Sequence, residues 1–153
     1  MPDWSKEDVV INHWLSDPSY LHPANSTFQN ARMILQLTQA YLLGIDQMHK
    51  GLVPLLAKSL PEVSPDQLQF TYEILSEATW DDGSPVTADD VIFTFKANKC
   101  PLTDNPMQKP PLENLKTIIP DPSNPKRFTI VMKRKYIQAI SLMTDYPILS
   151  RKF

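Results

Sequence analysis

Two segments of the chain alternate between apolar and polar residues, strictly at positions 68–74 and less regularly at 128–132. Successive side chains of a strand point to opposite faces of a sheet, so this pattern predicts strands with one buried and one solvated face. A turn rich in Pro, Ser and Asp precedes each segment, and a short strand-forming run precedes each turn, at 59–63 and 115–119. The sequence therefore predicts two antiparallel hairpins.

Residues 28–40 predict the first of two main helices. Polar residues that can cap a helix stand just before it, at 25–27. Ile34, Leu37 and Tyr41 recur at spacings of three and four, which places them on one apolar stripe. We expect this stripe to face the core.

Residues 88–99 predict the second helix. Thr87 is a suitable N-cap, and Asp89 and Asp90 fall in the first turn, where negative charge interacts favourably with the helix dipole. An Asp-Gly pair, typical of a tight turn, precedes this helix. Its acidic residues could instead form a metal or acid/base cluster, but their spacing lacks the alternating oxygen ligands of a calcium loop. A turn and a helix start account better for their positions.

Shorter elements complete the predicted fold. A first strand is expected at 9–15, and a small hairpin should pair residues 43–45 with 52–53. Residues 137–143 predict a short helical segment, because apolar residues recur at every third position: Ile137, Ile140 and Met143. Together these elements predict an α+β fold with a mainly antiparallel sheet and flanking helices.

The composition narrows the function classes. The chain has 15 Pro and only 3 Gly, which favours many short connected elements. Apolar residues make up 42% and charged residues 21%, so a packed core is feasible. The net charge of -2 provides no strongly basic face, which argues against a nucleic-acid partner. No apolar run approaches the roughly 20 residues that span a bilayer.

The residues most often used in catalysis are sparse. Cys100 is the only cysteine, so it cannot form a disulfide within the chain, and we expect an inert, partly buried thiol. The three histidines lack the short helical spacing of zinc motifs. We therefore expect no enzyme activity, no cofactor and no bound metal.

Residues 80–95, Trp-Asp-Asp-Gly-Ser-Pro-Val-Thr-Ala-Asp-Asp-Val-Ile-Phe-Thr-Phe, carry a specific resemblance. They resemble the turn and helix of family 5 of the bacterial extracellular solute-binding proteins, the oligopeptide- and dipeptide-binding class. Segments 21–23, 54–57 and 64–66 are similar to further family segments in the same order. His22 stands where the family usually has Asp, which makes this chain a divergent member.

The resemblance implies a fold and a place within it. Residues 1–153 would form the N-terminal segment of lobe I of a periplasmic binding protein-like fold (type II, cluster C), including the insertion subdomain of that lobe. The rest of lobe I and the second lobe would lie outside this chain. In such proteins the ligand is enclosed between two lobes.

The resemblance also implies a function. The chain would belong to the substrate-binding component of an ABC importer, which captures peptides or a related small solute outside the cytoplasmic membrane and delivers them to the permease subunits. Its place would be periplasmic or at the cell surface, after removal of a signal or lipoprotein segment, with membrane contact only through a lipid anchor or the permease. The alternative is a ligand-sensing domain of a transcriptional regulator built on the same fold.

One segment is expected to touch the ligand. The family's loop after the first strand lies at the lobe interface, and the resemblance places that contact at Thr27, Phe28 and Gln29. A helix N-cap followed by a hydrophobic staple explains the same residues without a ligand. Both roles can hold at once.

Overall fold

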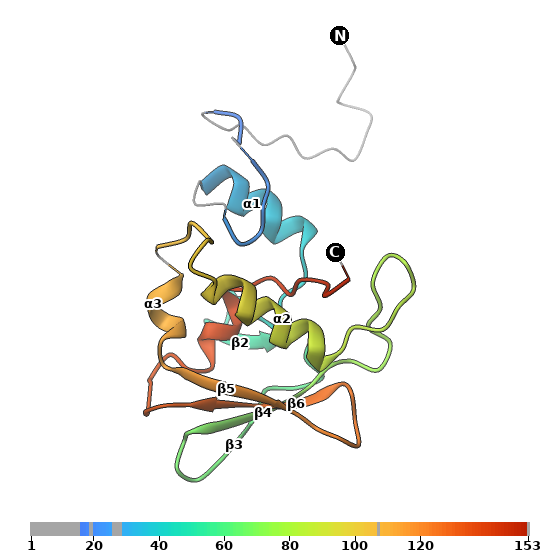
Figure 1. Ribbon diagram of the computed structural model, residues 1–153, viewed down its shortest axis with the longest axis vertical. Coiled ribbons are helices and arrows are strands. Elements are labelled where there is room, and N and C mark those ends of the chain that lie inside the picture. Colours follow the sequence, from blue (N-terminus) through green and yellow to red (C-terminus); the bar gives the residue numbers. More distant parts are fainter. Residues whose placement is uncertain (1–15, 19, 26–28, 107, 153) are drawn as a thin grey trace.

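The computed structural model describes residues 16–18, 20–25, 29–106 and 108–152 of the chain. One long helix lies across a four-stranded sheet, and a short hairpin and a separate helix stand beside these layers (Figure 1). This arrangement confirms the predicted α+β fold with a mainly antiparallel sheet. The strand predicted at 9–15 lies outside the described residues.

The main sheet has the strand order β3-β4-β6-β5, and each neighbouring pair is antiparallel. Side chains of the two central strands alternate between buried and partly exposed positions, as the sequence pattern predicts. The pairs β3–β4 and β5–β6 confirm both predicted hairpins. The four strands are β3 (Glu62–Val63), β4 (Gln69–Glu73), β5 (Leu115–Pro120) and β6 (Arg127–Met132).

Helix α2 (Ala88–Lys99) covers one face of this sheet and has the predicted bounds (Figure 1). It buries Val91 and Phe95 in the same core as the inward side chains of β4 and β6. Within that core the rings of Tyr72 and Phe128 stack with their centroids 5.6 Å apart. Burial of these large apolar side chains supplies the main driving force for the two-layer packing.

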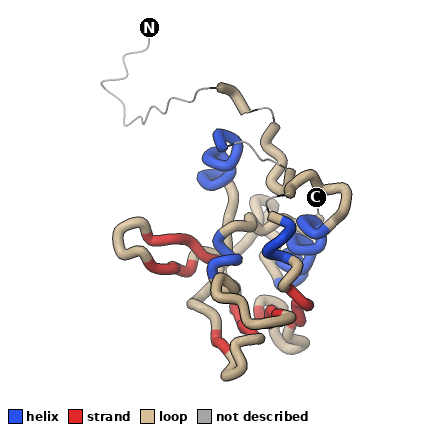
Figure 2. The backbone as a smooth tube through the Cα atoms, turned by 90° about the vertical axis from the view of Figure 1, so that its left-hand side faces the viewer, coloured by secondary structure: helices blue, strands red, loops and turns tan. Residues whose placement is uncertain are grey.

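A second, smaller sheet pairs β1 (Leu43–Asp46) with β2 (Gly51–Pro54), which confirms the predicted small hairpin. Its two strands project from the rest of the molecule (Figure 2). The base of the hairpin packs against the 3₁₀ helix η2 (Ser141–Thr144). Just beyond η2, the Ile148 amide donates to the Ala40 carbonyl at 2.8 Å, so the last segment of the chain returns to the start of the hairpin.

Helix α1 (Gln29–Thr38) lies apart from the sheet, beyond α2 (Figure 1). It buries Ala31 and Leu35, whereas Leu37 is 80% exposed. The predicted stripe through Leu37 is therefore wrong. Ala31 and Leu35, four positions apart, form the contact face of α1. This face is narrower than the predicted stripe, because the helix meets the remaining structure along one side only.

The prediction of a helical segment at 137–143 is correct only at its end, where η2 begins at Ser141. Leu142 and Met143 are buried, but Ile137 is fully exposed. Residues 137–140 form turns instead of a continuous helix, so a spacing of three does not keep these side chains on one face. A further short helix, α3 (Lys109–Leu112), starts in the Pro-rich stretch after α2.

Two buried tyrosines allow a matched test of the core. The Tyr72 hydroxyl is buried without a hydrogen-bond partner among the described residues, whereas the Tyr146 hydroxyl donates to the Gln108 carbonyl. Tyr72→Phe should leave the free energy of unfolding unchanged or raise it, and Tyr146→Phe should lower it by about 1 kcal/mol. Urea unfolding of both variants measures the difference. An equal loss of stability in the two variants would contradict this account.

Candidate functional site

The predicted ligand contact lies at the start of α1. Gln29 is the first residue of this helix and its side chain is exposed, so it is available to a ligand. Thr27 and Phe28 lie outside the described residues. Of the three predicted site residues, the structure therefore positions Gln29.

The loop after α2 folds back onto the segment that leads to α1. The side-chain amide of Asn105 donates to the Ala24 carbonyl at 3.0 Å, and the Asp104 amide donates to Asn25 Oδ1 at 3.2 Å. Asn105 is only 3% exposed, although it lies in a Pro-rich stretch that reads as a solvated loop. Sequence reasoning missed this contact, because these residues are about 80 positions apart and no local pattern connects them.

The same loop is fixed to the last part of the chain. Gln108 accepts a hydrogen bond from the Tyr146 hydroxyl at its carbonyl and contacts Asn105 through its side chain. The Lys109 ammonium donates to the carbonyls of Pro101 and Thr103, which closes the loop on itself. We call residues 22–25, Gln29, residues 103–106 and Gln108 the α1 edge.

A small cavity lies beneath α1, bordered by Arg32, Tyr41, Gln108 and Asp145. Burial raises the pKa of Asp145, and the positive charge of Arg32 partly opposes that rise. Burial likewise raises the pKa of Tyr41. With a volume of about 30 Å³, the cavity has room for water and is too small for a peptide.

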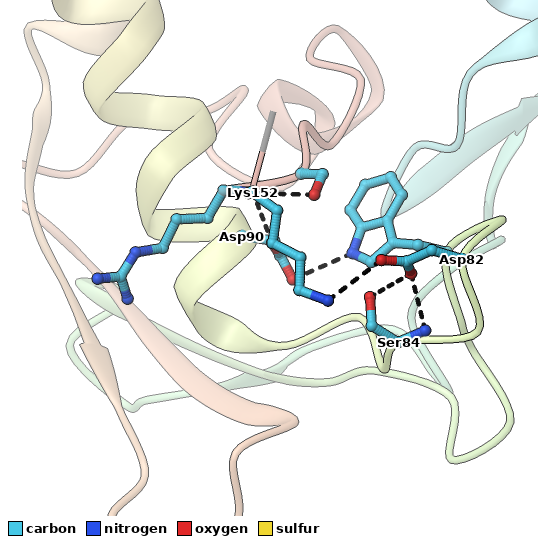
Figure 3. Close-up of polar contacts among 7 residues, drawn as sticks. Asp82, Ser84, Asp90 and Lys152 are labelled. Atoms are coloured by element: carbon cyan, nitrogen blue, oxygen red, sulfur yellow. Dashed lines mark hydrogen bonds and ion pairs between the residues drawn. The ribbon is translucent and has the colours of Figure 1, made fainter.

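The turn and helix start at 80–90 are organised around the Asp90 carboxylate (Figure 3). Asp90 Oδ2 accepts from the Thr87 amide at 2.9 Å and from Trp80 Nε1 at 3.4 Å. An acidic side chain at the third helical position that reaches back to the N-cap amide is one half of a capping box. Thr87 as N-cap is therefore confirmed, and Asp90 serves the helix start.

The C-terminal segment, residues 146–152, forms hydrogen bonds with the same helix, α2. Asp90 Oδ1 accepts from the Arg151 amide at 2.9 Å, and the Thr94 hydroxyl accepts from the Leu149 amide at 2.8 Å. Both acceptors are buried, so these contacts hold the segment along α2. No local pattern predicts these contacts, because the positions of Thr94 and Asp90 are already explained by helix α2 itself.

Asp82 lies in the turn that precedes α2, and its carboxylate also contacts Lys152, the last residue that the structure describes. It accepts from the Ser84 hydroxyl and amide, and it forms an ion pair with Lys152 Nζ at 3.1 Å (Figure 3). The Ser84 hydrogen bonds, assisted by Lys152, lower the pKa of Asp82 to about 2. A second exposed ion pair joins Arg151 to Asp89 at 2.8 Å.

A single lysine holds the chain just before Trp80. The ammonium of Lys126 donates to three carbonyls, those of Leu75, Ser76 and Ala78, at 2.8, 2.8 and 3.0 Å. Three convergent carbonyls satisfy the three N–H donors of an ammonium group. Lys126 lies in the β5–β6 hairpin. It thereby fixes the residues that lead into the turn at Trp80.

The acidic residues of the turn and helix therefore have structural partners. Asp82 and Asp90 accept hydrogen bonds from the turn, the helix start and the C-terminal segment, as the turn-and-cap interpretation predicts. Within the part of the chain that the structure describes, no group of three or more His, Cys, Asp or Glu side chains is arranged to hold a metal ion. Among those residues, no helix is long and apolar enough to cross a bilayer.

The same turn and helix lie inside a family match. Residues 51–150 match the model of the bacterial extracellular solute-binding proteins, family 5 Middle. The match includes the main sheet, α2 and most of the C-terminal segment. The chain belongs to family 5 of the bacterial extracellular solute-binding proteins.

Relatives of this family 5 chain share parts of its sequence and its fold. A Brucella abortus protein whose name describes it as a candidate ABC transporter peptide-binding protein is 48% identical over 50 residues, which are 33% of this chain and 9% of that protein. The structure of Haemophilus influenzae OppA, solved with the peptide RPPGFSPFR, aligns with a TM-score of 0.77 and 21% identity. That of Campylobacter jejuni NikZ, solved with Ni(L-His), aligns with a TM-score of 0.71 and 24% identity.

These alignments confirm the periplasmic binding protein-like fold. Each covers 90% of this family 5 chain but only part of the other protein: 29% of OppA and 26% of NikZ. The chain therefore spans between a quarter and a third of the length of the solved proteins it matches.

The pKa of Asp82 predicts a pH dependence for this family 5 chain. Because folding lowers that pKa from 3.8, the stabilisation is present above about pH 4 and is lost as the pH falls through about 2. Asp82→Asn removes the charge at every pH. The melting temperatures of the two proteins should therefore differ at neutral pH and converge near pH 2.

Thermal unfolding across this pH range is the measurement, and Asp81→Asn, at the neighbouring exposed carboxylate, is the matched control. The control should follow the unmodified protein throughout. A melting-temperature difference between Asp82→Asn and the unmodified protein that persists undiminished at the acid end would contradict the assignment.

Proposed function

We propose that this chain is part of the substrate-binding component of an ABC importer, which captures peptides or a related small solute outside the cytoplasmic membrane and delivers them to the permease. The observation that carries the proposal is the family match over residues 51–150. It is supported by relatives named for peptide binding, among them the Brucella proteins and OppA. Residues 1–153 would form the first segment of lobe I with its insertion subdomain.

Capture of a ligand requires a binding surface and no catalytic groups. In a two-lobe protein the ligand is buried by closure, and binding comes from contacts that both lobes make. The α1 edge suits this role, because Asp104 and Asn105 hold Asn25 and Ala24, which precede α1, by hydrogen bonds. We assign the ligand contact on this edge to Thr27, Phe28 and Gln29.

The proposal includes a location and partners. Solute-binding proteins of this family work outside the cytoplasmic membrane, so the chain would be periplasmic or at the cell surface. It would meet the permease subunits there and need no catalytic group or cofactor. A lipid anchor would be the only membrane attachment of its own.

Two glutamines of α1 provide a matched test. Gln29 and Gln36 are both exposed and lie two helical turns apart on the same side of α1. In the protein encoded by the full gene, Gln29→Ala should weaken peptide binding roughly threefold to tenfold, the effect of losing one hydrogen bond, whereas Gln36→Ala should leave it unchanged. Calorimetric titration with peptides selected from a mixed short-peptide library measures both.

Two outcomes would count against the proposal in different ways. If no library peptide binds the unmodified protein, peptide capture is wrong. If peptides bind and both variants bind equally well, the function stands and the assignment of the ligand contact to the start of α1 is wrong.

A further inference from the structure

A second open site lies far along the chain from the α1 edge. It is a groove of about 750 Å³ between the β3–β4 hairpin and the turns that follow β6. Val63 and Phe70 border it on the hairpin side, and Tyr136, Ile137 and Ile140 border it on the other. Grooves of this volume are large enough to receive several side chains of a partner.

The groove presents apolar side chains to solvent. Ile137 is fully exposed, and Val63 is exposed by 43%. Exposed aliphatic residues are ordinary when scattered singly, but here they border one concave surface. An apolar side chain of a partner could cover Ile137 and Val63. Removing their side chains from water would favour association.

The rim of the groove is basic. Lys133, Arg134 and Lys135 are consecutive and exposed, and none forms an ion pair within the described part of the chain. By contrast, the described ion pairs use other cations, among them Arg127 and Lys152. Of these three, Arg134 and Lys135 line the groove, in a chain whose net charge is -2.

These cations are held on fixed backbone. Arg134 Nε donates to Asn114 Oδ1 at 2.7 Å, and the Lys133 amide donates to the Asn114 carbonyl at 2.7 Å. Asn114 is itself buried, beside the start of β5. The terminal nitrogens of Arg134 make no hydrogen bond among the described residues, so they are available for a carboxylate, which guanidinium groups bind in bidentate fashion.

One carboxylate, that of Asp66, interacts electrostatically with the rim cation Lys135. Asp66 accepts from the Ser64 hydroxyl and the Leu68 amide, and these bonds, with a smaller contribution from Lys135, lower its pKa. One carboxylate beside the two groove-lining cations, Arg134 and Lys135, leaves the rim positive. A negatively charged partner is therefore the one that complements this surface.

We propose that this groove is a docking site for an acidic peptide segment of a protein partner, which places an aliphatic or aromatic side chain against Ile137 and its carboxylates on Arg134 and Lys135. The apolar floor favours a polypeptide over a nucleic acid, whose phosphates would use the rim alone. The site is independent of the proposed solute contact on the α1 edge. It goes beyond solute capture and describes how the chain would meet another protein.

The test is fluorescence anisotropy with a labelled peptide that alternates Glu and Leu and has blocked ends. We expect saturable binding that weakens with salt, and binding at least about tenfold weaker for the matching Gln-Leu peptide. The double variant Arg134→Gln/Lys135→Gln should weaken binding of the Glu-Leu peptide by about tenfold or more, and Ile137→Ser by about threefold or more. Gln29→Ala should have no effect.

Two exposed positions outside the groove provide matched controls. Lys116→Gln repeats the loss of a cation, and Leu102→Ser repeats the loss of an exposed aliphatic side chain. Both should bind as the unmodified protein does. Absence of binding, equal binding of the Gln-Leu peptide, insensitivity to Ile137→Ser, or equally tight binding of a labelled single-stranded oligonucleotide would each overturn the proposal.

Discussion

The carboxylate of Asp90 joins the turn and N-cap just before it to a segment about 60 residues further along the chain. It accepts hydrogen bonds from the turn at Trp80, from the N-cap at Thr87 and from the C-terminal segment at Arg151. Asp90 is only 6% exposed, and a buried carboxylate is tolerated only when its lone pairs are satisfied. The need to satisfy this one group therefore fixes the turn, the start of α2 and the path of residues 149–152 together.

From this point a chain of hydrogen bonds leads to the α1 edge. The C-terminal segment that Asp90 holds also contacts Ala40 through Ile148, and Tyr146 in the same segment donates to Gln108. The loop containing Gln108 in turn holds the residues before α1 through Asn105. These hydrogen bonds connect the residues before α1 to the sheet through the C-terminal segment.

Much of the fold follows from local pattern, because alternation and caps are local properties. Leu68–Ile74 and Phe128–Met132 alternate, and Thr87 caps α2, so the main sheet and α2 could be predicted. The face of α1 could not, because Leu37 fits an apolar spacing yet is 80% exposed, and the predicted helical segment at 137–143 failed in the same way at the fully exposed Ile137. Nor could the site contacts, since Asn105 binds Ala24 across about 80 residues and only tertiary structure brings them together.

The central claim is that Asp90, and not its neighbour, organises the turn and the C-terminal segment. The direct measurement is amide hydrogen exchange at Arg151 and Leu149, together with urea unfolding, in Asp90→Asn and Asp89→Asn. Asp90→Asn should lower the free energy of unfolding by about 2 kcal/mol, because the buried charge and one acceptor oxygen are lost. Exchange should increase at Arg151, whose amide donates to Asp90, and at Leu149, which lies in the segment that this bond holds. Asp89→Asn removes only an exposed ion pair and should change stability by less than about 1 kcal/mol. Equal effects of the two variants, or unchanged exchange at Arg151 in Asp90→Asn, would contradict the account.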